Sequence, residues 1–137
     1  MNAITPNAKT VFSGRTLTTS GKDGATHSQD GTFEMKLPQP HPAAENLFAS
    51  AWSACYLGAI ELSAQARKIK LPAHPSVDTT IDLNHAGGTN FFLKANLNVH
   101  IDGLDAAVVR ELAEAAHGIC PYSKAVHGNI DVITNVI

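Results

Sequence analysis

The residues from Leu47 to Ile60 carry no charge, and this run of 14 residues constrains the fold more than any other feature of the chain. Helix-compatible residues surround it from about position 43 to about position 69, where Leu71-Pro72 ends the helix. Apolar side chains recur at spacings of three and four, with few polar positions between them. A helix that is apolar on nearly all sides is buried on several sides. We therefore expect a buried central helix, because a bilayer-spanning helix needs ~20 apolar residues.

Alternation of apolar and other residues predicts strands on both sides of this helix. The most regular case runs from Phe91 to Asp102, where six apolar residues stand at every second position. Such alternation indicates a sheet with one solvated face, which favours antiparallel pairing. The other expected strands and turns are a β-branched strand at Val11–Thr19, a hairpin turn at Ser20–Gly24, a turn at Asp30-Gly31, and strands at Phe33–Leu37, Val77–Asn84 and Ile130–Ile137.

A second helix is expected to begin after Asp105, which is a suitable N-cap, and to end or kink at Cys120-Pro121. A short helical turn follows at Ser123–His127. Strands, helix, strands, helix and strand in this order predict the α+β class, with antiparallel sheets around the buried central helix. The length of 137 residues fits a single domain over residues 1–137.

Charge and composition exclude several classes of function. Lys plus Arg number 10 and Asp plus Glu 12, giving a net charge of −2 without any block of like charge. This balance argues against a nucleic-acid footprint and against a membrane-binding basic patch. The first residues, Met1–Pro6, contain neither a basic nor an apolar signal region. We therefore expect a cytoplasmic protein.

The two cysteines, Cys55 and Cys120, are the residues with most chemical potential. In a reducing compartment they are inert buried thiols, metal ligands or a transient catalytic pair, and inert burial is the commonest outcome for a free cysteine. Apolar surroundings raise the pKa of a thiol, so a reactive Cys55 needs a cation or hydrogen-bond donors from elsewhere. Glu45 lies ten residues earlier, ~15 Å away in a continuous helix, so it cannot touch Cys55 within that helix.

Histidine chemistry offers two further alternatives. His117, Cys120 and His127 are candidate zinc ligands, although no fourth ligand is evident. His117 is also a candidate base for Cys–His hydrolysis, although no residue that would orient it is apparent. We expect no metal and no cofactor.

The segments 44–59 and 115–132 read AENLFASAWSACYLGA and AAHGICPYSKAVHGNIDV. They closely resemble the organic hydroperoxide resistance proteins, a subfamily of the osmotically inducible protein C superfamily. The resemblance implies an intertwined homodimer that reduces organic hydroperoxides, including those of fatty acids, to alcohols. It assigns Cys55 as the peroxidatic cysteine and Cys120 as the resolving cysteine, which form a disulfide that a dithiol reductant, a lipoylated protein, reduces again.

The resemblance also implies an arginine and a glutamate beside the peroxidatic thiolate. Glu45 matches the glutamate, but Lys22 stands where the family has its arginine, and Arg15 is the alternative cation. Lysine is a flexible point charge, whereas arginine offers a planar fork that bonds two partners at once. The competing hypothesis is a structural or small-molecule-binding member of the same fold without catalysis.

Overall fold

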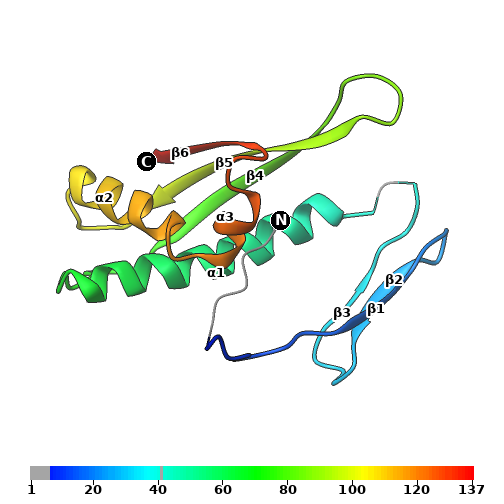
Figure 1. Ribbon diagram of the computed structural model, residues 1–137, viewed down its shortest axis with the longest axis horizontal. Helices are drawn as coiled ribbons and strands as arrows, with labels where there is room; N and C mark the ends of the chain where they lie inside the picture. The colour runs from blue at the N-terminus through cyan, green and yellow to red at the C-terminus, as the bar shows by residue number, and fades with distance from the viewer. Residues whose placement is uncertain (1–6, 41) are drawn as a thin grey trace. The chain divides into compact units, whose positions relative to one another are not determined.

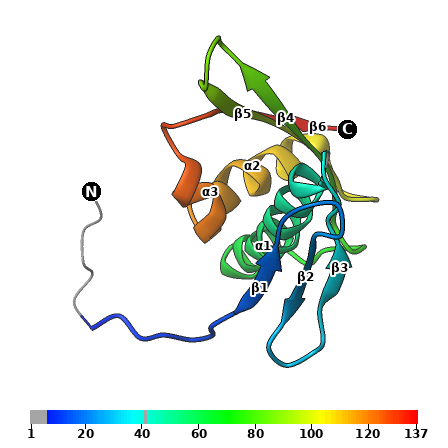
Figure 2. The ribbon, with the colours of Figure 1, turned by 90° about the vertical axis from the view of Figure 1, so that its right-hand side faces the viewer.

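The computed structural model describes residues 7–40 and 42–137, drawn in two orientations in Figures 1 and 2. The chain divides into two compact units, Met1–Ala43 and Ala44–Ile137, which are described separately below. The first unit contains strands and the second contains helices and strands, so the predicted α+β class is confirmed. The expectation drawn from Met1–Pro6 lies outside the described residues, and the single domain over residues 1–137 stays a prediction.

Three short strands form the sheet of the N-terminal unit. They are β1 (Thr16–Thr19), β2 (Ala25–Ser28) and β3 (Glu34–Lys36), which pair antiparallel in the order β1-β2-β3. The predicted turn at Ser20–Gly24 joins β1 to β2, and the N–H of Gly24 donates to the carbonyl of Gly21 at 3.0 Å. A Cβ at Gly24 would lie 2.5 Å from the carbonyl oxygen of Leu37, so only glycine fits there. Lys22 is an exposed residue of this turn.

The second predicted turn, at Asp30-Gly31, joins β2 to β3. The Asp30 carboxylate accepts hydrogen bonds from the Ser28 hydroxyl at 2.6 Å and from the N–H of Thr32 at 3.1 Å. These hydrogen bonds stabilise the charged carboxylate, and they lower the pKa of Asp30 to about 2, with the largest contribution from Ser28. The strand expected from Val11 begins only at Thr16, so that prediction was too long.

Helix α1 (Ala44–Ala66) is the longest element of the C-terminal unit. It ends three residues before the predicted boundary because Lys68 adopts a left-handed conformation, with φ of 56°. This conformation lets the N–H of Ile69 donate to the carbonyl of Ala64 at 2.9 Å, and the N–H of Lys68 donate to that of Gln65 at 3.1 Å. This pair of bonds is the Schellman motif that closes many helices.

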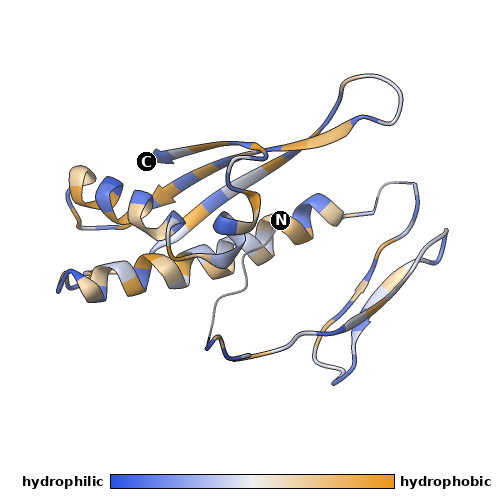
Figure 3. Ribbon diagram, in the orientation of Figure 1, coloured by the Kyte–Doolittle hydropathy of each residue, from blue (hydrophilic) through white to orange (hydrophobic). Residues whose placement is uncertain are grey.

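One face of α1 packs against the rest of the C-terminal unit, which includes β4, α2 and α3. Its buried residues are Trp52, Tyr56, Ala59, Ile60, Ser63 and Ala64. Apolar residues occur along most of the length of α1 (Figure 3). Some of them, including Ala51, Ala54 and Leu62, lie outside the packed face and are exposed. The C-terminal unit by itself therefore does not bury α1 on several sides. By length and composition α1 could cross a membrane, but the core helix of a soluble protein passes the same test.

The second sheet contains β4 (Ser76–His85), β5 (Phe91–His100) and β6 (Asp131–Val136), in the order β4-β5-β6. β4 and β5 form the predicted antiparallel hairpin, whose tip extends beyond the helices (Figure 1). The alternation predicted for β5 is confirmed over its second half, where Ala95, Leu97 and Val99 are buried. Phe91, near the tip, is 58% exposed.

β6 runs parallel to β5, so the prediction of a wholly antiparallel sheet was wrong. The reason is the connection, since α2 (Ala106–His117) and α3 (Pro121–Val126) lie between the two strands in the sequence. A connection that contains helices carries the chain back to the starting edge, as parallel pairing requires. The predicted cap is confirmed, because the Asp105 carboxylate accepts the N–H of Ala107 at 2.8 Å.

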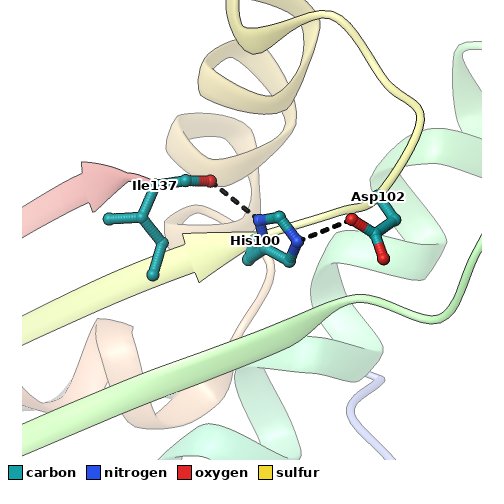
Figure 4. A network of polar contacts seen from close by, with 3 residues as sticks. All are labelled: His100, Asp102 and Ile137. Carbon is teal, nitrogen blue, oxygen red and sulfur yellow. Dashed lines mark hydrogen bonds and ion pairs between the residues drawn. The ribbon is translucent and has the colours of Figure 1, made fainter.

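His100 joins the end of β5 to the end of β6 (Figure 4). Its Nδ1 lies 2.8 Å from the carbonyl oxygen of Ile137, and its Nε2 lies 2.9 Å from a carboxylate oxygen of Asp102. The hydrogen bond with Ile137, followed by that with Asp102, raises the pKa of His100. The protonated ring donates to both oxygens at once, so this clamp is strongest when His100 is charged.

Candidate functional site

Cys55 lies in the middle of α1, and Cys120 lies at the N-cap of α3. Cys120 precedes a proline, which favours the extended backbone that it adopts, with φ of −64° and ψ of 118°. Pro121 then occupies the first turn of α3, where its missing N–H leaves no helical bond unmade. Cys120 is fully buried and Cys55 is half-buried, and both are free thiols.

The structure brings the two thiols together from positions 65 residues apart in the sequence. Burial raises the pKa of the Cys55 thiol, and hydrogen bonding with the Cys120 side chain raises it further. The backbone N–H of Tyr122 lowers the pKa of Cys55, because an N–H group near the sulfur favours the thiolate. Among the residues described, no cation contributes to the pKa shift of Cys55. The C-terminal unit alone therefore keeps this thiol protonated.

A chain of buried and half-buried polar side chains lies beside Cys120. The N–H of Ser123 donates to the Cys120 sulfur at 3.4 Å, and the Ser123 hydroxyl accepts from Trp52 Nε1 at 2.9 Å. His117 Nδ1 lies 2.8 Å from the same hydroxyl, and His117 Nε2 lies 2.8 Å from the Thr134 hydroxyl. Sequence reasoning missed Ser123 and Thr134. The placement of Ser123 three residues after Cys120 is the N-cap spacing, and it is the one signal that could have pointed to Ser123.

The geometry around His117 supports neither the zinc site nor the Cys–His hydrolysis considered from the sequence. Both ring nitrogens of His117 lie within hydrogen-bond distance of hydroxyl groups, and its ring packs against that of Tyr56, with centroids 4.6 Å apart and the planes tilted by 32°. Burial lowers the pKa of His117, so the ring is neutral at pH 7. In residues 7–40 and 42–137, no three His, Cys, Asp or Glu side chains lie close enough together to hold a metal ion. His117, Cys120 and His127 therefore do not form the zinc site considered above.

The remaining predicted site residues do not reach Cys55 within the C-terminal unit. Glu45 lies in the first turn of α1, and α1 is unbroken as far as Cys55, so ~15 Å of helix separates the two residues. Lys22 and Arg15 belong to the N-terminal unit, where both are exposed. Arg15 also lines a cavity of about 390 Å³ inside that unit, together with Asp30.

The fold and the paired thiols define a class of α+β protein in which a long helix and a short helix each present one cysteine to the other. The family model described as OsmC-like protein matches residues 37–135. An organic hydroperoxide resistance protein from Xanthomonas axonopodis pv. citri is 32% identical over 133 residues, which span 90% of this chain and 93% of that protein. Organic hydroperoxide resistance protein OhrA from Bacillus subtilis is 30% identical over 136 residues, which span 92% and 96%.

Solved structures agree with the sequence relatives. An organic hydroperoxide resistance protein from Legionella pneumophila superposes with a TM-score of 0.85 at 30% identity, over 93% of this chain and 98% of that one. OhrB of Bacillus subtilis superposes with a TM-score of 0.82 at 30% identity, over 93% and 100%. The chain therefore belongs to the OsmC-like protein family, and the resemblance noted in the sequence is confirmed.

Proposed function

We propose that this protein is a thiol-dependent peroxidase that reduces organic hydroperoxides, including those of fatty acids, to alcohols. The observation that carries the proposal is the proximity of Cys55 and Cys120 inside one unit, where Cys55 packs against the buried cluster that contains Cys120 and the two thiols affect each other's ionisation. The names of the relatives from Xanthomonas, Bacillus and Legionella support hydroperoxides as the substrate class.

The proposed reaction has two chemical steps. The Cys55 thiolate attacks one peroxide oxygen, the O–O bond breaks, and the leaving alkoxide takes a proton to become the alcohol. Cys55 is thereby oxidised to a sulfenic acid. The Cys120 sulfur then attacks the Cys55 sulfur, a disulfide forms, and the displaced hydroxide leaves as water with the thiol proton. A dithiol reductant, which we propose is a lipoylated protein, returns both cysteines to thiols by exchange and is itself oxidised to a disulfide.

A cation must offset the raised pKa of Cys55 before the first step is fast. We propose that Lys22 supplies it and that Glu45 orients Lys22. An opposite charge within ~4–6 Å lowers a pKa by about 1–3 units, enough to oppose the effect of burial. Arg15 is the alternative cation.

We propose that the active form is an intertwined homodimer. Glu45 cannot reach Cys55 along its own α1 helix, which supports a site completed by a partner chain. The exposed apolar residues of α1, Leu62 among them, support a second copy packed against that helix. We further propose a cytoplasmic location, because recycling of the disulfide by a dithiol requires a reducing compartment.

Thiol titration with one equivalent of an organic hydroperoxide tests the proposed function. The expected result is the loss of two thiols per chain, with a disulfide between Cys55 and Cys120 identified by peptide mass. In Cys120→Ser, Cys55 should instead stop at the sulfenic acid, which dimedone traps. Cys55→Ser should consume no peroxide. Retention of both thiols in the unaltered protein would favour the non-catalytic binding module.

A further inference from the structure

Ser123 connects the resolving thiol to both neighbouring helices. Its N–H donates to the Cys120 sulfur at 3.4 Å. Its hydroxyl accepts from Trp52 of α1 at 2.9 Å and lies 2.8 Å from Nδ1 of His117 at the end of α2. The Ser123 side chain is buried, and its bond to Trp52 is shielded from water, whereas the His117 ring is half-buried.

The donors and acceptors of this network determine the direction of each bond. The indole N–H of Trp52 can only donate, so the Ser123 oxygen accepts from it. The neutral ring of His117 has one N–H, and the arrangement that satisfies every group places that hydrogen on Nε2, facing Thr134. Ser123 then donates its single hydroxyl hydrogen to His117 Nδ1. The hydroxyl is thus held in one orientation from two sides.

This anchoring matters because α3 is only six residues long and has little stability of its own. Two successive N–H groups in its first turn face the two sulfurs. That of Ser123 bonds Cys120 at 3.4 Å, and that of Tyr122 is near enough to Cys55 to lower the pKa of its thiol. Any displacement of this turn therefore changes the position of both sulfurs relative to each other.

We propose that Ser123 is a positioning residue that holds the Cys120 sulfur in line for attack on oxidised Cys55, through its bonds to Trp52 and His117. The inference rests on the proposed function, since it concerns the second step of that reaction. Loss of the hydroxyl leaves the buried Trp52 N–H and the His117 Nδ1 without a partner, so the first turn of α3 shifts to regain one. A misplacement of about 1 Å lowers the rate of a positioned reaction by about 100-fold.

The test compares Ser123→Ala with Ser63→Ala in the full-length protein. Ser63 is a matched control because it is fully buried on α1 and its hydroxyl bonds only Arg67, at 2.7 Å. Cumene hydroperoxide is the probe. Dimedone trapping measures sulfenic acid formation at Cys55, and free-thiol loss measures disulfide formation.

In Ser123→Ala we expect disulfide formation, which needs both sulfurs in place, to slow by about 10- to 100-fold. The first step does not involve Cys120, so it should slow by a clearly smaller factor, through the displaced N–H of Tyr122 alone. Excess peroxide should then over-oxidise Cys55 to the sulfinic acid. Ser123→Thr, which keeps the hydroxyl, should restore most of the rate, and Ser63→Ala should change neither step. Trp52 is the only tryptophan, so a shifted emission spectrum in Ser123→Ala would report the lost indole bond.

Two results would overturn the inference while leaving the proposed function intact. One is disulfide formation in Ser123→Ala at the unaltered rate, and the other is an equal slowing of both steps, which would indicate a general loss of structure. A second measurement does not depend on peroxide: the equilibrium of the Cys55–Cys120 pair with a glutathione buffer. Ser123→Ala should lower the effective concentration of the two thiols by about tenfold or more. If the protein ignored peroxide, the proposed function would fail, and an unchanged glutathione equilibrium would separately refute the positioning role.

Discussion

Replacement of Leu62 by glutamate tests whether a second copy covers α1. Leu62 is 55% exposed in the single chain, so Leu62→Glu should change the stability of one chain by about 0.5 kcal/mol or less. Burying a leucine side chain completely stabilises a protein by about 1.5–3 kcal/mol, and because Leu62 is about half exposed, a partner chain would contribute roughly half of that on burying the rest. In a twofold-symmetric dimer both copies of Leu62 lie at the interface, so the free energy of dimerisation should be weaker by about 1.5–3 kcal/mol. That loss weakens the dimer by about 10- to 150-fold, before any penalty for the buried carboxylate.

Sedimentation equilibrium measures the dimer dissociation constant, and circular dichroism checks that the chain stays folded. Peroxide turnover should fall in parallel with the dimer population. Ile133→Glu is the matched control, because Ile133 is 56% exposed on β6 of the same unit and alternates with Val132 and Thr134, which line a cavity together with Trp52 of α1. The reasoning is refuted if Leu62→Glu dimerises as tightly as the unaltered protein, or if that protein is an active monomer.

Three further predictions concern single side chains. Lys22→Ala should slow oxidation of Cys55 by about 10- to 1000-fold in stopped-flow assays, and Lys22→Arg should keep or raise the rate; a loss confined to Arg15→Ala would transfer the role to Arg15. The pKa of His100 is raised by folding, so its stabilising effect is complete below the unfolded value of about 6.5 and is lost as the pH rises through the folded value. The difference in urea midpoint between the unaltered protein and His100→Asn should therefore shrink in alkaline buffer, and a constant difference would contradict the clamp. Asp105→Ala removes the cap of α2 and should reduce the free energy of unfolding by about 1 kcal/mol, measured by urea denaturation.

Local features of the fold could be predicted because local chemistry determines them. Glycines that permit tight turns identified the Ser20–Gly24 hairpin, and alternation along Phe91–His100 identified β5. The cap at Asp105 follows from the short side chain that reaches the N–H of Ala107. Each of these features depends on residues only a few positions apart.

Features that depend on distant contacts could not be predicted. The order of elements allows β6 to pair in either direction, and only the path through α2 and α3 makes it parallel. The end of α1 depends on a left-handed lysine, Lys68, in a position that glycine usually occupies. An apolar helix looks the same in sequence whether its own chain or another copy covers it, so the exposed side of α1 was not foreseen.

In the candidate site too, the local sequence identified single residues but not the contacts between distant ones. The two cysteines were identified from their motifs, but their contact joins the middle of α1 to the start of α3. The network of Trp52, Ser123 and His117 gathers side chains from three helices, and no short segment of sequence records that arrangement.

The contact between Cys55 and Cys120 has a consequence for heat resistance. A covalent link there would enclose β4, β5 and α2 in one loop of 65 residues. Loop-closure entropy for a ring of that size destabilises the unfolded chain by about 4 kcal/mol. The disulfide-bonded protein should therefore melt at a higher temperature than the reduced one, and a simple thermal scan would report how much of a sample carries the disulfide.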